Sequence, residues 1–420
     1  MTSSATSWID VKADSDFTIH NIPFGIYSDP TVSHRACTAI GEYIVDLYEL
    51  ANAGLLNVNK NVLEKPVLNE FIALGKSVTT ALRLRLIELL SHPDAGLKSN
   101  DELVKKALKP MRSVQMQMPV QVGDYTDFYS SIDHATNIGT MIRDPKNALM
   151  PNWKHLPVGY HGRASSICVS GHQFHRPKGQ QKPADSDLPV YGPCKLLDIE
   201  LETAFIIGKS TALGETVSTA KADDYIFGMV LFNDWSARDI QTWEYVPLGP
   251  FLAKNFASTI SPWIVTLEAL EPFRTKGYVQ DPKVLPYLQY QGDKNLDIQL
   301  DVFLKPAGGE ENKICSSNYK YMYWTMEQQV AHHTINGCNL NVGDLMGSGT
   351  ISGPDPSEYG SMMELTWRGT KPIKLKDGSE RKFVNDGDTL ILRGRCERNG
   401  IRIGFGDCAA TVLPATPDQF

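Results

Sequence analysis

Two glutamates with a two-residue spacing are the first residues that could do chemistry. With Asp198 before them, Glu200 and Glu202 alternate with the apolar Ile199 and Leu201, so in a strand the two glutamates would point to one side, together with Asp198. Their Cα atoms would then lie roughly 6.5–7 Å apart. Two carboxylates so close repel each other unless positive charge lies between them. A solvated strand face is the alternative, but the apolar continuation over 205–207 favours a buried strand.

Two aspartates stand in similarly apolar surroundings. Asp127 lies among the aromatic residues of the segment 123–131, and Asp234 ends the apolar run 228–233 just before Trp235. A buried acid rarely stays unpaired. With the two glutamates, these aspartates would form an all-oxygen site of the kind that selects Mg²⁺, Ca²⁺ or Mn²⁺ over zinc or copper. The spacing leaves their convergence open, because the four acids span more than 100 residues.

A histidine and three cations complete the set of reactive candidates. His134 follows Asp127 within the polar segment 131–137, where it is either a general base or a structural histidine. Arg143, Arg238 and Lys254 lie in polar, glycine-rich or aromatic stretches. These cations are suited to bind an anionic substrate or to pair with surface acids.

The elements that must position these residues divide into two groups along the chain. Within the first ~115 residues the patterns predict short strands at 16–27 and 36–47, one amphipathic helix at 68–90, and a shorter helix from Asn100 that ends before Pro110. Alternating residues at 113–118 indicate an extended connector. We therefore expect two domains, with boundaries at 1–118 and 119–420.

Beyond the expected boundary, short apolar runs predominate. They predict a series of strands at 199–207, 228–232, 296–302 and 389–392. One helix is expected at 325–336, ended by Gly337. No strand–helix alternation is sustained, which argues against a doubly wound parallel sheet. The expected fold class is therefore mainly β, of the α+β type.

Composition and missing motifs exclude several classes of protein. The 420 residues are 42% hydrophobic and 21% charged, with a net charge of −7, which is typical of a globular chain and not of a nucleic-acid-binding one. No apolar run reaches ~20 residues, and the first residues resemble no secretory signal. Seven cysteines without a CxxC pair indicate free thiols in a reducing compartment.

Known catalytic motifs are also missing from the sequence. It contains no dinucleotide-binding GxGxxG, P-loop, HExxH or GxSxG motif, which argues against nucleotide enzymes, zinc proteases and serine hydrolases. The adjacent His332 and His333 would point to different sides of a helix and make a poor metal pair.

Several long strings resemble the fumarylacetoacetate hydrolase family. They are GDYTDFYSS at 123–131, HATN at 134–137, LPVGYHGRASS at 156–166, NDWSARDIQ at 233–241, WEYVPLGPF at 243–251, and GTISG at 349–353 followed by Glu364. The resemblance runs from about Asp16 to Pro414. It implies a small SH3-like N-terminal barrel domain, a large mixed β-roll catalytic domain, and a cytoplasmic homodimer. The implied reaction is metal-dependent hydrolysis of a carbon–carbon bond in 4-fumarylacetoacetate to fumarate and acetoacetate, the last step of tyrosine and phenylalanine breakdown.

The resemblance also assigns roles to individual residues. The divalent-metal ligands, described with Ca²⁺, are Asp127, Glu200, Glu202 and Asp234; a Mg²⁺ description adds Lys254 and a position held here by Ser258 instead of threonine. An ammonium has no lone pair, so Lys254 would contribute through its backbone carbonyl or a neighbouring site. His134 matches the catalytic base and Glu364 its orienting partner. The groups that would stabilise an oxyanion are Arg238, Gln241 and Lys254, and the substrate contacts are Tyr129, Arg143, Tyr160, Gln241, Tyr245 and Thr350.

Two other readings remain open from the sequence. One is a related metal-dependent enzyme, such as an acylpyruvase, an oxaloacetate decarboxylase or a dienoate isomerase or hydratase. Those enzymes are usually shorter and lack the N-terminal domain. The other is a non-catalytic binding protein, although such a protein would have no use for a costly cluster of like charges.

Overall fold

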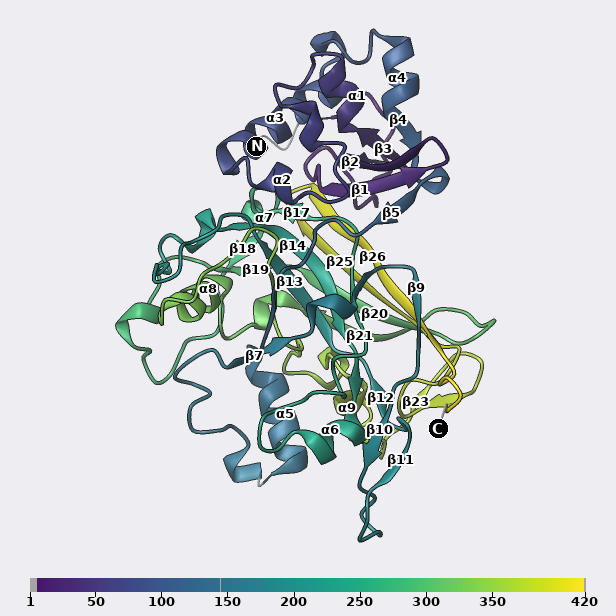
Figure 1. The fold of residues 1–420 in the computed structure, drawn as a ribbon, viewed down its shortest axis with the longest axis vertical. Coiled ribbons are helices and arrows are strands. Elements are labelled where there is room, and N and C mark those ends of the chain that lie inside the picture. The colour runs from purple at the N-terminus through teal and green to yellow at the C-terminus, as the bar shows by residue number, and fades with distance from the viewer. Residues whose placement is uncertain (1–5, 144, 419–420) are drawn as a thin grey trace.

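A computed structural model describes residues 6–143 and 145–418 of the chain. The N-terminal part is built on an antiparallel five-stranded sheet of order β4-β3-β2-β1-β5, shown in purple and blue in Figure 1. Its strands are β1 (Phe24–Asp29), β2 (Val32–Ile40), β3 (Tyr43–Asp46), β4 (Leu108–Pro110) and β5 (Gln115–Gln117). The two edge strands follow each other in the chain and are joined by a 3₁₀ turn at Met111–Ser113. This connectivity agrees with the SH3-like barrel implied by the family resemblance.

Several N-terminal elements differ from their expected form. The strand expected at 16–27 begins only at Phe24, and the one expected at 36–47 is part of a hairpin whose turn contains Gly41 in a left-handed conformation (φ +56°). The helix expected at 68–90 is broken into α2 (Asn69–Ile72) and α3 (Lys76–Ser91), because Gly75 also has a positive φ. The hydrophobic pattern gave no sign of this three-residue break, in which the apolar Leu74 is exposed.

Other N-terminal features agree with the sequence pattern. Helix α4 (Asp101–Ala107) is capped by the Asn100 side chain, which accepts a hydrogen bond from the Leu103 backbone N–H. The short helix α1 (Leu47–Asn52) lies earlier in the chain, directly after β3. The expected connector at 113–118 contains a strand, because residues 115–117 pair with β1. The end of the N-terminal segment is therefore fastened to its own sheet before the chain enters the larger part.

The large part of the chain contains a mixed eight-stranded sheet that carries the site. Its order is β7-β6-β22-β13-β14-β16-β8, with β17 also paired to β14. The strands are β6 (Tyr125–Phe128), β7 (Gly159–Gly162), β8 (Ile167–Val169), β13 (Leu201–Ile207), β14 (Ile226–Asp234), β16 (Ser258–Ile260), β17 (Val265–Thr266) and β22 (Leu345–Gly347). Every residue of β13 and β14 is buried. Strands covered on both faces explain their continuous apolar runs.

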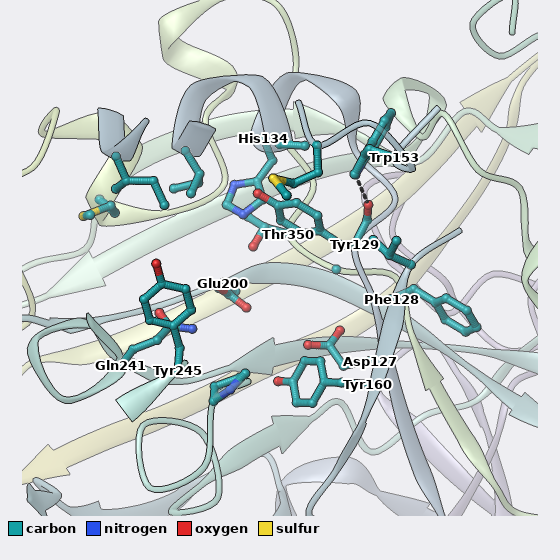
Figure 2. A pocket seen from close by; sticks show the side chains of 18 of the residues that line it. Asp127, Phe128, Tyr129, His134, Trp153, Tyr160, Glu200, Gln241, Tyr245 and Thr350 are labelled. Atoms are coloured by element: carbon teal, nitrogen blue, oxygen red, sulfur yellow. Dashed lines mark hydrogen bonds between the residues drawn. The ribbon is translucent and has the colours of Figure 1, made fainter. Parts of the chain in front are cut away.

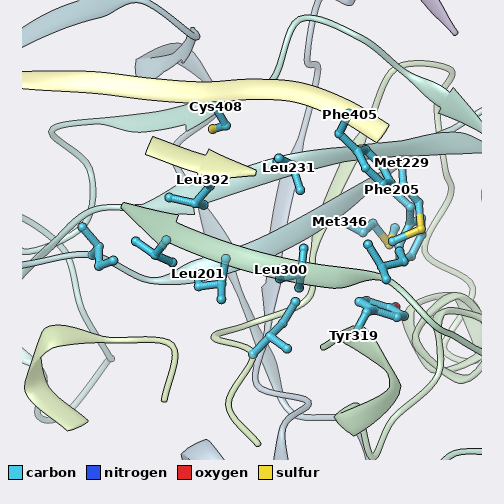
Figure 3. Packing of buried hydrophobic residues seen from close by; sticks show 14 of the residues in the cluster. Leu201, Phe205, Met229, Leu231, Leu300, Tyr319, Met346, Leu392, Phe405 and Cys408 are labelled. Atoms are coloured by element: carbon cyan, nitrogen blue, oxygen red, sulfur yellow. The ribbon is translucent and has the colours of Figure 1, made fainter. Parts of the chain in front are cut away.

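A second sheet packs against the first. It has the order β21-β20-β25-β26-β9, from β9 (His172–His175), β20 (Gln299–Lys305), β21 (Asn312–Asn318), β25 (Thr389–Arg398) and β26 (Ile401–Leu413). Figure 3 shows the core between the two sheets, where Leu201, Leu231 and Phe205 meet Leu300 and Leu392. This core gives the carboxylates on the first sheet a rigid support.

Short helices and two-stranded ribbons complete the fold. The helices are α5 (Ile132–Ile142), α6 (Arg238–Glu244), α7 (Leu267–Leu270), α8 (Met326–Thr334) and α9 (Met362–Leu365). The ribbons pair β10 (Lys178–Gln181) with β11 (Val190–Pro193), β12 (Leu197–Asp198) with β15 (Ser236–Ala237), β18 (Arg274–Thr275) with β19 (Asn295–Leu296), and β23 (Ile373–Lys374) with β24 (Glu380–Arg381). Mainly β structure with interspersed helices confirms the expected fold class.

The strands and the helix expected beyond residue 118 are present with altered limits. The strand expected at 199–207 begins only at Leu201, as β13, and the alternating run at 296–302 is divided between β19 and β20. The expected strand at 228–232 extends to both sides as β14, and the one at 389–392 continues to Arg398. Helix α8 begins with a reciprocal capping box between Thr325 and Gln328.

Two further features concern the cysteines and the helices. Each of the seven cysteines is free. Within residues 6–143 and 145–418, no helix has the length and apolar character needed to cross a membrane.

Candidate active site

Four carboxylates come together where strands of the large sheet end. Asp127 is on β6, Glu202 on β13 and Asp234 at the end of β14, while Glu200 immediately precedes β13. Each offers an oxygen, and these oxygens lie within 4.8 Å of one another. Glu200, the most exposed of these four residues, has only 6% of its surface accessible to solvent. The structure therefore brings together the acids that the sequence could not join.

Burial and mutual repulsion disturb the ionisation of these acids. Burial, followed by the charge of neighbouring carboxylates, raises the pKa of Asp127 and of Glu202 well above the usual range. Burial also raises the pKa of Asp234, although Lys254 opposes the shift. For Glu200, burial is outweighed by Lys254 and Arg238, which lower its pKa. The repulsion among these carboxylates is therefore only partly balanced by the charged groups of the protein.

The residues present fit a divalent metal ion. Asp127 Oδ1 and Glu202 Oε1 are both buried without a hydrogen-bond partner, which is costly unless another group binds them. Gly347 lies between the two carboxylates, and a Cβ there would stand 3.1 Å from Glu202 Oε2 and 3.3 Å from Asp127 Oδ1. Hard oxygen donors of this kind suit Mg²⁺, Ca²⁺ or Mn²⁺. The glycine thus leaves the carboxylates room to converge.

Lys254 and Ser258 contact the acids from the protein side. Lys254 Nζ lies 2.5 Å from Glu200 Oε2 and 2.7 Å from Asp234 Oδ2. The hydroxyl of Ser258 donates to Asp234 Oδ1 at 2.9 Å. Both side chains therefore act as hydrogen-bond donors to the carboxylates, and the Lys254 ammonium serves as a counter-charge.

His134 and Glu364 form a buried pair next to the carboxylates. His134 Nδ1 donates to Glu364 Oε2 at 2.7 Å, so Nε2 is the ring nitrogen left for chemistry. Burial alone would raise the pKa of Glu364, but His134 and several hydrogen bonds hold it below its usual value. The neighbouring donors to this carboxylate are Asn137 Nδ2, Ser352 Oγ and Ser361 Oγ. Such a supported carboxylate fixes the tautomer of its histidine.

Arg238, the first residue of α6, lies on the other side of the acids. Its Nη1 is 2.9 Å from Glu200 Oε1 and donates to Gln241 Oε1 at 3.2 Å. Its Nη2 is buried without a partner among the described residues. The Gln241 amide nitrogen is likewise directed away from Arg238, because its oxygen accepts that hydrogen bond. Both residues belong to the lining of one cavity.

One cavity of about 750 Å³ joins these groups. Its lining includes Asp127, Glu200, His134, Arg238 and Lys254, and the predicted substrate contacts Tyr129, Arg143, Tyr160, Gln241, Tyr245 and Thr350. Figure 2 shows His134, Tyr129 and Thr350 on one side, Asp127 and Tyr160 on another, and Gln241 with Tyr245 opposite. Glu202, Asp234, Ser258 and Glu364 are not part of the lining and act from behind it.

Several residues that shape the site were not singled out by sequence reasoning. Asn137 and Ser352 lie inside strings that resemble the family, yet only the structure shows that they hold Glu364. Asp198 was expected on the same strand face as Glu200, whereas its carboxylate binds Arg238 and the start of α9. Gly347 gave no sequence signal, because its role depends on side chains from two other strands.

A carboxylate cluster suited to a hard divalent ion, next to a histidine–carboxylate pair in one cavity, is typical of metal-dependent hydrolytic enzymes. Comparison with known proteins makes this class more specific. The fumarylacetoacetate (FAA) hydrolase C-terminal family matches residues 125–413, and the fumarylacetoacetase N-terminal family matches residues 20–119. The chain belongs to the fumarylacetoacetate hydrolase family.

Individual relatives agree with this assignment over nearly their whole length. The chain is 55% identical to fumarylacetoacetase of Homo sapiens over 416 residues, covering 97% of this chain and 99% of the relative. It is 52% identical to fumarylacetoacetase of Dictyostelium discoideum over 423 residues, at 98% and 99% coverage. A fumarylacetoacetate hydrolase from psychrophilic Exiguobacterium antarcticum shares the fold at a TM-score of 0.53 and 17% identity, covering 94% of this chain and 99% of that one.

Proposed function

We propose that this protein hydrolyses 4-fumarylacetoacetate to fumarate and acetoacetate. The observation that carries the proposal is a cavity lined by Asp127, Glu200, His134 and Arg238, with the remaining acids of the cluster and the partner of His134 directly behind the lining. We infer the substrate from relatives named fumarylacetoacetase, which are 55% and 52% identical to this chain over nearly its full length. The N-terminal family match argues against the shorter related enzymes considered above.

The general base in this proposal is His134. Its Nε2 takes a proton from water, whose oxygen forms a bond to a ketone carbon of the substrate. Glu364 keeps Nδ1 protonated and stabilises the imidazolium that forms. The carbon–carbon bond then breaks, its electron pair goes to the leaving carbon, and that carbon finally receives a proton. The products are two carboxylic acids, one of them a β-keto acid.

The oxyanion that develops on the attacked carbonyl needs donors. We assign Arg238 this role because it lines the cavity and its Nη2 has no partner among the described residues, so donation from Nη2 would break no existing hydrogen bond. Gln241 Nε2 provides a second donor, and Lys254 adds positive charge beside the acids. Removing one donor of this kind typically costs roughly 10²–10³ in rate.

The remaining cavity residues are proposed to bind the ends of the substrate. Arg143 lies on the exposed part of the lining, where its guanidinium also donates to the Ala148 carbonyl at 2.6 Å. It is suited to bind a substrate carboxylate. Tyr129 packs edge-on against His134, with ring centroids 5.3 Å apart, and so limits the position of the imidazole. Tyr160, Tyr245 and Thr350 supply hydroxyl groups around the space.

The metal ligands in this proposal are Asp127, Glu200, Glu202 and Asp234. A bound Ca²⁺ or Mg²⁺ would supply Lewis-acid polarisation of the diketone oxygens. The protein balances only part of the acid charge, because Lys254 and Arg238 are the cations in direct contact with these carboxylates among the described residues. A dication would relieve the repulsion that remains.

Further features of the proposal rest on the family. We propose a cytoplasmic homodimer in which residues 1–118 form one domain and residues 119–420 the catalytic domain. The family matches, which end at 119 and begin at 125, support this division.

A substrate assay tests the function directly. Loss of the ultraviolet absorbance of the diketone, followed with fumarylacetoacetate and with simple acylpyruvates, measures the preference of the enzyme. We expect turnover of fumarylacetoacetate that falls on addition of a chelator. Turnover of acylpyruvates alone would instead support a related enzyme of the superfamily, and no turnover of either would favour a binding protein.

A further inference from the structure

Asp198 is a fully buried carboxylate that none of the roles above uses. It ends β12 and has 0% of its surface accessible. Its Oδ1 accepts hydrogen bonds from the backbone N–H groups of Ile199 and Met362, both at 2.7 Å. Its Oδ2 accepts from Arg238 Nε at 2.8 Å and from the Met363 N–H at 3.1 Å. The four acceptor positions of an ionised carboxylate are thus all occupied.

The bond to Arg238 fixes the direction of its free nitrogen. A guanidinium is planar and rigid, so holding two of its nitrogens determines where the third one points. Asp198 holds Nε, and Glu200 together with Gln241 holds Nη1. This arrangement leaves Nη2 as the nitrogen without a partner among the described residues, on a side chain that lines the cavity. Without Asp198, the guanidinium could rotate about its remaining contacts.

The bonds to Met362 and Met363 fix a second part of the site. These residues form the first turn of α9, and Glu364 follows directly. Glu364 in turn holds His134 Nδ1 at 2.7 Å. One carboxylate therefore connects two groups that approach the cavity from different elements: Arg238 on α6, and Glu364 on α9, more than 120 residues later in the chain.

We propose that Asp198 is a positioning residue that fixes the orientation of the oxyanion donor Arg238 relative to the His134–Glu364 pair. The proposal deepens the hydrolytic function proposed above and rests on it. Because the oxyanion exists only in the transition state, a misplaced Arg238 lowers kcat and leaves substrate binding nearly unchanged. A residue that merely stabilised the fold would change neither constant per folded molecule.

The test is the isosteric variant Asp198→Asn, with Asp388→Asn as its matched control. Asp388 is also buried, and it accepts from Arg381 Nε at 2.8 Å, from Arg381 Nη2 at 3.0 Å and from the Asn385 N–H at 2.9 Å, away from the cavity lining. Both variants lose one carboxylate charge next to an arginine, so both are expected to lower Tm. Only Asp198→Asn is expected to lower kcat, by about 10²-fold, with KM changed less than about threefold.

A double-mutant cycle shows whether the effect passes through Arg238. In an Arg238→Lys background, which lacks the planar fork, Asp198→Asn is expected to cost at most about tenfold in kcat. Asp198→Glu keeps the charge but shifts the carboxylate by one methylene, and it is expected to retain the kcat defect. This variant also keeps the inference testable if the asparagine variant does not fold.

Three results would overturn the inference. They are a wild-type kcat in Asp198→Asn, wild-type kcat in Asp198→Glu, or costs that multiply fully in the double variant. The wild-type enzyme, assayed in parallel, separates this failure from that of the proposed function. If the wild type hydrolyses fumarylacetoacetate and the variants do so equally well, only the positioning role is lost. If the wild type does not, the hydrolytic function is refuted and the positioning role falls with it.

Discussion

Replacing Glu364 with glutamine removes one charge from the proposed general-base pair with little change in shape. Glu364 Oε2 accepts from His134 Nδ1 at 2.7 Å and from Ser361 Oγ at 2.7 Å, and an amide oxygen can keep both hydrogen bonds. The amide nitrogen would then face Asn137 Nδ2, which donates to Glu364 Oε1 in the wild type. The variant therefore keeps the histidine tautomer and loses the negative charge.

The size of the effect follows from the burial of the pair. The two side chains are only 3% and 0% exposed, so solvent screens their interaction weakly. Opposite charges about 4 Å apart at an effective dielectric constant of about 20 attract by about 4 kcal/mol. In the wild type this attraction stabilises the imidazolium that forms as His134 takes a proton. Since about 1.4 kcal/mol corresponds to tenfold in rate, Glu364→Gln is expected to lower kcat by about 10³-fold.

The assay is kcat from loss of diketone absorbance, measured with Tm for each variant. Glu327→Gln is the matched control, because Glu327 is equally buried, pairs with Arg274 at 2.9 Å and does not line the cavity. The control is expected to lower Tm and keep kcat near that of the wild type. A loss of less than tenfold in the Glu364→Gln variant, or an equal loss in the control, would refute the role given to this carboxylate.

Two further predictions concern pH and packing. The raised pKa values of Asp127 and Glu202 mean that the metal-free folded chain binds more protons than the unfolded chain above about pH 4, so Tm in chelator should fall as pH rises from 5 to 8. Excess Ca²⁺ or Mg²⁺ should flatten this slope, and equal slopes with and without metal would contradict it. Gly139→Ala should destabilise the fold by more than about 1–3 kcal/mol, because the new Cβ would stand 1.9 Å from the Ala148 carbonyl oxygen. The free energy of unfolding, measured with denaturant, is compared with that of Gly192→Ala, whose Cβ would contact nothing within 4 Å. Equal losses of stability in the two variants would contradict the predicted clash at Gly139.

Local patterns predicted the elements of this fold better than their ends. The continuous apolar run before Asp234 predicted a strand, which the structure shows as the fully buried β14, and Asn100 before acidic residues marked the start of α4. The helix break at Gly75 was missed, because a hydrophobic pattern reports which face is buried and not whether the backbone is continuous. The alternating residues before residue 118 read equally well as a connector or as strand β5, since only the partner strand distinguishes the two.

The candidate site shows the same limit at the level of side chains. Glu200 and Glu202 were marked by their spacing alone, but their meeting with Asp127 depends on β22 lying between β6 and β13. Asp198 was treated as one more acid on that strand. Its two sets of partners lie some 40 and 164 residues further along the chain, a distance that no local pattern can cross.

The central claim is that the four-carboxylate cluster binds a divalent ion on which hydrolysis depends. The most direct measurement is the number of divalent ions bound per chain, determined with turnover on the same dialysed protein as Ca²⁺ or Mg²⁺ is added back. We expect turnover to rise with occupancy of one site per chain, and Glu200→Ala to bind no ion and to lack turnover while remaining folded. Full turnover in the ion-free protein, or unchanged ion content and activity in Glu200→Ala, would contradict the account.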